Sequence, residues 1–132
     1  MPGTEPGLSR PRRILIVEDN ELNLRLLRDL LDYHGYETVP TGLGEVAVRL
    51  AIEKHPDLIL LDIQLPDILG TEAARRLKAD ERTRAIPIIA VTAFAMPGDR
   101  AAIIASGCDD YVSKPIPVSE FLGLVARYAA RG

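Results

Sequence analysis

Leu58-Ile59-Leu60-Leu61-Asp62 is the stretch that decides the fold of this 132-residue chain. Four large apolar residues in a row are typical of a strand that is buried on both faces of a parallel sheet. Asp62 follows at once, where an unpaired charge would be costly to bury. We therefore expect Asp62 to lie at the carboxyl end of a central strand, where open α/β sheets bind their ligands.

Charged or hydroxyl side chains follow three other apolar runs in the same way. Residues 14–17 (Ile-Leu-Ile-Val) lead into Glu18 and Asp19, residues 86–91 lead into Thr92, and residues 111–113 lead into Lys114. The carboxyl ends of parallel strands lie at one edge of their sheet. We expect these side chains to converge at that edge.

Helix-like stretches separate the apolar runs. We expect strands at residues 14–17, 36–40, 57–62, 86–92 and 110–113, helices at about residues 44–54, 70–79, 97–107 and 118–130, and one further helix that carries Leu24, Leu27 and Leu31 and ends at Gly35. This alternation predicts an α/β fold, a doubly wound parallel (βα)5 sheet with the flavodoxin-like strand order 2-1-3-4-5. In that order the first and third strands are neighbours, so Glu18, Asp19 and Asp62 share one pocket.

Length and composition indicate one globular domain. The chain is 47% hydrophobic and 27% charged, which is ordinary for a folded protein of this size. Its net charge of −3 argues against nucleic acid or anionic lipid as the main partner. Because Cys108 is the only cysteine and no signal peptide or long apolar run is present, we expect a cytoplasmic protein without membrane insertion. We expect residues 1–12 to form a flexible tail and residues 13–132 to form the domain.

The three acidic side chains need a cation. Carboxylates that share a pocket repel one another and raise one another's pKa unless their charge is neutralised. Mg²⁺ prefers such hard oxygen ligands, so we expect Glu18, Asp19 and Asp62 to organise a magnesium ion. The simpler alternative is that Glu18 and Asp19 only cap the following helix or face water. That alternative does not account for Asp62, which ends the most apolar run of the chain.

Thr92 and Lys114 complete a candidate site for phosphoryl transfer. Lys114 precedes Pro115, which restricts the backbone of the lysine, and its ammonium offers a point charge for a phosphoryl oxygen. Thr92 offers a hydroxyl beside Asp62. A carboxylate can attack phosphorus to form an aspartyl phosphate, while Mg²⁺, lysine and threonine offset the growing charge on the phosphoryl oxygens.

Four ordered motifs resemble those of the response-regulator receiver domain, from about residue 13 to the end of the chain. They are Val17-Glu18-Asp19-Asn20, Asp62 with Gln64-Leu65-Pro66, Val91-Thr92-Ala93 and Lys114-Pro115. Within that family the chain is most similar to stand-alone cell-cycle receivers, through residues 18–23 (Glu-Asp-Asn-Glu-Leu-Asn) and 92–96 (Thr-Ala-Phe-Ala-Met). Glu18 departs from the aspartate that is commoner at its position in the family.

The resemblance implies a role for each residue of the site. Asp62 accepts a phosphoryl group from a phosphohistidine. Asp19 and the backbone carbonyl of Gln64 bind Mg²⁺ directly, and Glu18 reaches the metal through water. The domain then catalyses only its own phosphotransfer and autodephosphorylation, and it is not otherwise an enzyme.

The resemblance also implies partners and a signalling surface. The phosphodonor is a histidine kinase or a histidine phosphotransfer protein, and Thr92 and Tyr111 form the switch, with Tyr111 turning inward. A downstream protein binds the face formed by the fourth helix, the fifth strand and the fifth helix. The fourth helix has few large side chains to anchor it, so a small change in free energy can shift it. We expect a monomer or a weak dimer.

Other functions fit parts of the sequence. Residues Gly42–Ala47 match the dinucleotide-binding pattern G-x-G-x-x-A, but the strand before them is half polar and Glu45 places negative charge where pyrophosphate would bind. A phosphatase with an aspartyl nucleophile would need a second acid where Gln64 stands. Within the receiver class, two alternatives stay open: a phosphate shuttle or sink in a phosphorelay, and a module separated from a hybrid histidine kinase.

Overall fold

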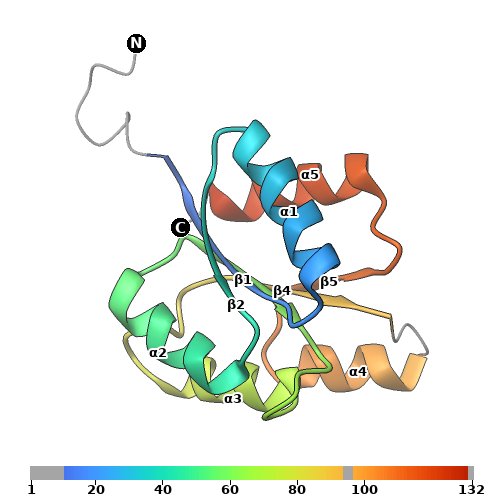
Figure 1. Cartoon of the computed structure of the whole chain (residues 1–132). Helices are drawn as coiled ribbons and strands as arrows, with labels where there is room; N and C mark the ends of the chain where they lie inside the picture. The colour runs from blue at the N-terminus through green and yellow to red at the C-terminus, as the bar shows by residue number, and fades with distance from the viewer. Residues whose placement is uncertain (1–10, 94–96, 131–132) are drawn as a thin grey trace.

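The computed structural model describes residues 11–93 and 97–130, in which five strands alternate with five helices (Figure 1). In chain order the elements are β1 (Arg13–Val17), α1 (Glu21–Tyr33), β2 (Glu37–Thr41), α2 (Gly44–Lys54), β3 (Leu58–Asp62), α3 (Gly70–Ala79), β4 (Ile88–Thr92), α4 (Pro97–Ala105), β5 (Asp110–Ser113) and α5 (Val118–Ala129). Every expected strand and helix is present. Residues 1–10 of the expected tail lie outside the described residues, as do residues 94–96 of the Thr-Ala-Phe-Ala-Met stretch.

The five strands form one parallel sheet in the order β2-β1-β3-β4-β5, which confirms the predicted fold class and strand order. All five residues of β3, the central strand, are buried, whereas those of β2, at the edge, are only half-buried. Pro40 suits this edge strand, because proline has no N–H to donate to a second neighbour. Pro87 likewise has no N–H to donate to a neighbouring strand, so β4 begins at Ile88 and not at Ile86 as predicted.

Helices cover both faces of the sheet, and successive strand residues point to opposite faces (Figure 1). Leu15, Val17, Ile59 and Leu61 pack against α2, α3 and α4 on one face. On the other face, α1 and α5 cover a second cluster that includes Ile14, Ile16, Leu58, Leu60 and the fully buried Phe121. Burial on both faces explains why the central strands are continuously apolar. No helix among the described residues is long and apolar enough to cross a membrane.

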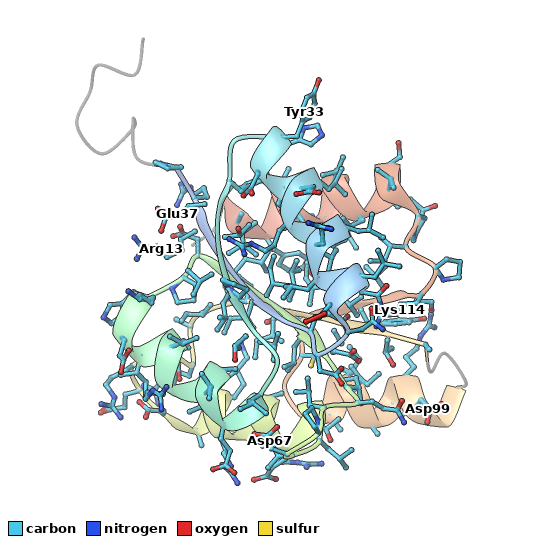
Figure 2. The ribbon with its side chains drawn as sticks, in the orientation of Figure 1. Arg13, Tyr33, Glu37, Asp67, Asp99 and Lys114 are labelled. Carbon is cyan, nitrogen blue, oxygen red and sulfur yellow. The ribbon has the colours of Figure 1, made fainter. Side chains whose placement is uncertain are left out.

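Ion pairs close the amino-terminal edge of the sheet at β1, β2 and β3. The Arg13 guanidinium lies 2.6 Å from the Glu37 carboxylate, which joins the first residues of β1 and β2 (Figure 2). The carboxylate of Asp57, just before β3, accepts a hydrogen bond of 2.8 Å from the Arg13 backbone N–H and pairs with Arg12 at 3.6 Å. These contacts fix where the three strands begin.

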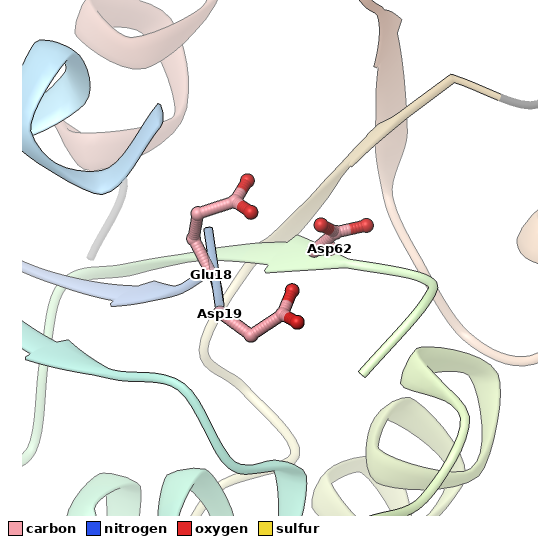
Figure 3. A group of neighbouring side chains, drawn as sticks. All are labelled: Glu18, Asp19 and Asp62. Carbon is pink, nitrogen blue, oxygen red and sulfur yellow. The ribbon is translucent and has the colours of Figure 1, made fainter. Parts of the chain in front are cut away.

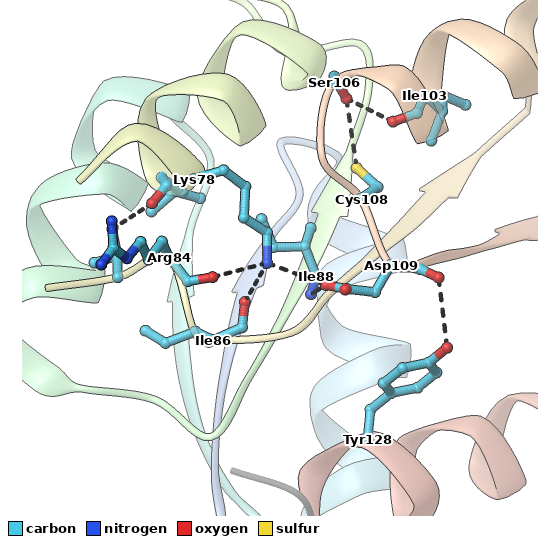
Figure 4. A network of polar contacts seen from close by, with 11 residues as sticks. Lys78, Arg84, Ile86, Ile88, Ile103, Ser106, Cys108, Asp109 and Tyr128 are labelled. Carbon is cyan, nitrogen blue, oxygen red and sulfur yellow. Dashed lines mark hydrogen bonds and ion pairs between the residues drawn. The ribbon is translucent and has the colours of Figure 1, made fainter. Parts of the chain in front are cut away.

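A second polar network holds the same edge at β4 and β5 (Figure 4). Lys78, on α3, donates to the carbonyl of Ile86 at 2.9 Å and lies 3.2 Å from the Asp109 carboxylate. Asp109 also accepts from the Ile88 backbone N–H at 2.8 Å, and the Tyr128 hydroxyl of α5 donates to the Asp109 carbonyl at 3.4 Å. This edge is therefore closed by side chains, while the opposite, carboxyl edge holds a polar cavity.

Candidate functional site

The cavity at the carboxyl edge of the sheet gathers the side chains that follow the strands. Glu18 and Asp19 follow β1, Asp62 ends β3, and their carboxylates face a common space (Figure 3). One carboxylate oxygen from each acid lies within 4.8 Å of the other two. The cavity has a volume of about 530 Å³ and is lined by the three acids and by Asn20, Asn23, Gln64, Leu65, Pro66, Leu69, Thr92, Ala93 and Lys114. It therefore contains every residue predicted for the site except Tyr111.

Glu18 is a buried carboxylate with two fixed partners. It is 2% exposed, and its Oε2 accepts a hydrogen bond of 3.1 Å from the Asn20 backbone N–H. Its Oε1 lies 2.9 Å from Lys114 Nζ. Burial raises the pKa of Glu18, and the negative charge of Asp62 adds to this effect, while the hydrogen bonds from Lys114 and Asn20 oppose it. The longer side chain of glutamate thus reaches across the cavity to the lysine that follows β5.

Lys114 bridges two of the acids. Its Nζ lies 3.1 Å from Asp62 Oδ2 as well as 2.9 Å from Glu18. Burial alone would lower the pKa of Lys114, but its hydrogen bonds to both carboxylates and their charges outweigh burial and raise the pKa. The other oxygen of Asp62, Oδ1, accepts a hydrogen bond of 3.1 Å from the Gln64 backbone N–H. The Asp62 carboxylate is therefore held from both sides at the end of β3.

The donor set of the cavity fits a hard divalent cation. Three carboxylates against one ammonium leave the cavity with net negative charge, and all three acids offer oxygen ligands of the kind that Mg²⁺ prefers. Each carboxylate oxygen has two lone pairs, so the hydrogen bonds to Asp62 leave it able to bind a metal ion. Asp19 lines the cavity and is exposed to solvent.

Replacing Glu18 with glutamine is expected to raise the melting temperature of the metal-free protein at pH 7 by a few degrees. Because the raised pKa means that the folded protein disfavours the charged carboxylate, the neutral amide removes this cost. The gain should shrink as the pH falls and Glu18 becomes protonated in the parent protein. Thermal unfolding in EDTA from pH 4 to 8 measures it.

Glu53→Gln is the control for this experiment, because Glu53 is an exposed carboxylate on α2 that pairs with Arg49 at 3.8 Å. This variant should melt within about one degree of the parent protein, as expected for an exposed ion pair. If Glu18→Gln melted at a lower temperature than the parent protein at pH 7, the Lys114 pair would outweigh the burial cost and the expectation would be wrong.

Thr92 and Tyr111 lie in different places. Thr92 is fully buried, lines the cavity, and accepts a backbone hydrogen bond of 2.8 Å from Lys114, which is joined to Pro115 by a cis peptide bond. Tyr111 is half-buried and lines a second groove of about 510 Å³ between α4, β5 and α5, which shares Lys114 with the cavity. The Arg100 guanidinium of α4 lies 4.6 Å from the centre of the Tyr111 ring and donates a hydrogen bond to its hydroxyl.

The structure shows which group occupies the helix start within Gly42–Ala47, the stretch that matches the dinucleotide-binding pattern. The first two backbone N–H groups of α2, those of Gly44 and Glu45, donate to the Asp67 carboxylate at 2.8 and 2.9 Å. These N–H groups are the ones that would bind a pyrophosphate. The side chain of Asp67 therefore occupies the position that a pyrophosphate would take. The hydrogen bond from Glu45 and the second from Gly44 lower the pKa of Asp67. Sequence reasoning missed Asp67, whose partners lie more than 20 positions away.

The parallel (βα)5 sheet and the acids, threonine and lysine at its carboxyl edge are the arrangement expected of a receiver domain. The model of the response regulator receiver domain family matches residues 14–126. The chain therefore belongs to the response regulator receiver domain family.

The relatives identify the kind of receiver more closely. The polar-differentiation response regulator DivK of Brucella ovis is 54% identical over 117 residues, which cover 89% of this chain and 95% of DivK. DivK of Brucella anthropi is 52% identical over 118 residues, with coverage of 89% and 96%. The chain is thus a DivK-like response regulator receiver domain, which confirms the predicted similarity to stand-alone cell-cycle receivers.

Solved structures share the fold. The receiver domain of the sensor histidine kinase PA1611 from Pseudomonas aeruginosa has a TM-score of 0.86 and 36% identity, and the match covers 92% of this chain and 99% of that domain. Its crystal structure has a magnesium ion coordinated in the active-site cleft. The signal receiver domain of a histidine kinase from Syntrophus aciditrophicus has a TM-score of 0.84 and 33% identity, with coverage of 90% of each chain.

Proposed function

We propose that Asp62 accepts a phosphoryl group from the phosphohistidine of a histidine kinase or a histidine phosphotransfer protein. The observation that carries this proposal is the position of the Asp62 carboxylate, held between Lys114 and the Gln64 N–H and beside two further acids. An Asp62 oxygen attacks phosphorus, the bond from phosphorus to the histidine nitrogen breaks, and an acyl phosphate forms. Lys114 stabilises the phosphoryl oxygens, because its ammonium already lies 3.1 Å from Asp62.

The proposed reaction depends on Mg²⁺, held by Asp19, Asp62 and the backbone carbonyl of Gln64, with Glu18 acting through water. The net negative charge of the cavity and its hard oxygen donors support this ligand set. When bound, the ion offsets the charge on the phosphoryl oxygens. Glu18 has a second role in this scheme, since it holds Lys114 at 2.9 Å.

The proposed switch runs from Thr92 to Tyr111. The Thr92 hydroxyl binds the new phosphoryl group, and the Tyr111 ring leaves Arg100 and turns inward. Among the described residues of α4, only Ile103 is buried, so few contacts oppose a shift of this helix. The face of α4, β5 and α5 then binds the downstream protein.

The bounds of the domain, its location, its catalysis and its oligomeric state are also proposals. The receiver domain extends over residues 13–132, beyond the residues 14–126 that match the family. The domain acts in the cytoplasm, where a kinase that uses ATP supplies the phosphohistidine. Its only catalysis is its own phosphorylation and dephosphorylation, and it works as a monomer or a weak dimer.

Incubation with acetyl phosphate and Mg²⁺ is expected to attach one phosphoryl group to the protein, and EDTA is expected to prevent it. Intact mass spectrometry measures the product, and hydroxylamine should remove the group because it cleaves acyl phosphates. Stable labelling that survives hydroxylamine would contradict an aspartyl phosphate.

Capture of partners with and without the phosphate mimic beryllium fluoride separates a switch from a phosphate shuttle. A switch binds a downstream protein only in the presence of the mimic, because the mimic selects the activated conformation. A shuttle or sink binds phosphodonor proteins alone. An identical set of partners in both states would exclude the switch.

A further inference from the structure

The loop that follows the candidate phosphoacceptor is fastened to the beginning of α2. The Asp67 carboxylate accepts hydrogen bonds from the N–H groups of Gly44 and Glu45 at 2.8 and 2.9 Å, and Asp67 is labelled in Figure 2. Ile68 packs against the same helix turn at Gly44. A Cβ atom at Gly44 would lie 2.6 Å from Ile68 Cγ1, so only glycine allows this close approach.

The fastened loop carries one of the proposed metal ligands. Gln64 lies between two anchors: its own N–H donates to Asp62 at 3.1 Å, and Asp67, three residues later, is bound to α2. Gln64 is exposed, so the core does not hold it in place. Its neighbour Leu65 is partly buried against the core, so the position of the Gln64 carbonyl depends on this contact and on the two ends of the short segment.

We propose that Asp67 is a positioning residue for the metal site. By fastening residues 64–67 to α2, it holds the Gln64 carbonyl where a divalent cation at Asp19 and Asp62 needs it. The inference rests on the proposed Mg²⁺-dependent phosphorylation of Asp62. A carboxylate suits the task, because its two oxygens accept from two neighbouring N–H groups at the positive end of a helix.

Asp67→Asn tests the role of this carboxylate, since the amide keeps the shape of the side chain but only one acceptor oxygen. Asp67 is exposed, so the variant should still fold. The dissociation constant for Mg²⁺, measured by calorimetry, is expected to rise about tenfold, at the lower end of the effect seen for residues that support metal ligands. In the metal-free protein, amide hydrogen exchange at Gly44, Glu45 and Gln64 is expected to become faster.

Two further variants separate position from charge. Glu45→Gln removes one negative charge beside the same helix turn and leaves both N–H donors in place, so Mg²⁺ binding should stay within twofold. Gly44→Ala changes no charge but forces Ile68 away, so it should weaken Mg²⁺ binding in the same direction as Asp67→Asn. Equal weakening by Glu45→Gln and Asp67→Asn would overturn the proposal in favour of a simple charge effect.

A merely structural helix cap would give a different result. In that case Asp67→Asn would lower the melting temperature and leave the Mg²⁺ dissociation constant unchanged, which would overturn the proposal. Acetyl phosphate labelling distinguishes this failure from failure of the proposed function. If the parent protein bound Mg²⁺ but was not labelled, the phosphoacceptor assignment would fail. If Asp67→Asn regained the parent labelling rate at saturating Mg²⁺, the positioning role would be supported.

Discussion

Replacing Asp62 with asparagine is expected to abolish phosphorylation by acetyl phosphate and Mg²⁺. The amide cannot act as the nucleophile on phosphorus. Among the described carboxylates, only that of Asp62 lies at the end of the central strand and contacts Lys114 Nζ. Asparagine keeps the size of the side chain, so the fold should persist. Intact mass spectrometry measures the loss of labelling, and a far-ultraviolet circular dichroism spectrum checks the fold.

Asp19→Asn is the matched control within the same cavity. Asp19 is a proposed metal ligand and not the nucleophile, so its variant should be labelled slowly at low Mg²⁺ and recover as the Mg²⁺ concentration rises. Undiminished labelling of Asp62→Asn would show that another side chain accepts the phosphoryl group. A complete loss in Asp19→Asn that excess Mg²⁺ did not restore would contradict the division of roles between the two acids.

Replacing Gly70 with alanine is expected to lower the free energy of unfolding by about 3 kcal/mol, the upper range for overpacking. Gly70 is the first residue of α3, and a Cβ atom there would lie 2.3 Å from the Asp62 carbonyl oxygen and 2.7 Å from Ile63 Cα. These are backbone atoms that cannot rotate away, so the helix or the end of β3 must move. Urea denaturation measures the loss.

Gly123→Ala is the control for this substitution, because Gly123 lies within α5 and a Cβ atom there would meet nothing within 4 Å. Alanine is the better helix former, so this variant should be more stable by roughly 0.5–1 kcal/mol. Opposite signs for the two substitutions would establish contact with the backbone of Asp62 and Ile63 as the cause. Little loss of stability in Gly70→Ala would mean that α3 can move away from β3 easily.

Much of the fold and the outline of the site follow from local patterns. Continuous apolar runs such as Leu58–Leu61 predict central parallel strands, because both faces of those strands must be buried. The helical stretches between the runs then leave few possible topologies. Asp62, Thr92 and Lys114 follow their strands directly, so strand order alone places them at one edge. The boundary of β4 was less predictable, since it depends on where Pro87 joins the ladder.

Only the tertiary structure decided which groups pair within that edge. Glu18 and Lys114 are separated by 96 positions, and no spacing in the sequence indicates that their side chains meet at 2.9 Å. The contacts of Asp67 with α2 likewise join a loop to a helix turn that precedes it by more than 20 residues.

The sequence by itself thus determined the sheet, its strand order and the charged character of the carboxyl edge. The tertiary structure decided that Lys114 lies between Glu18 and Asp62, that Tyr111 lies under Arg100, and that Asp67 occupies the start of α2. The physical reason is that hydrophobic periodicity is a local property that determines which face of an element is buried. Pairing between polar side chains depends on distances across the folded chain, and these exist only after the elements have packed.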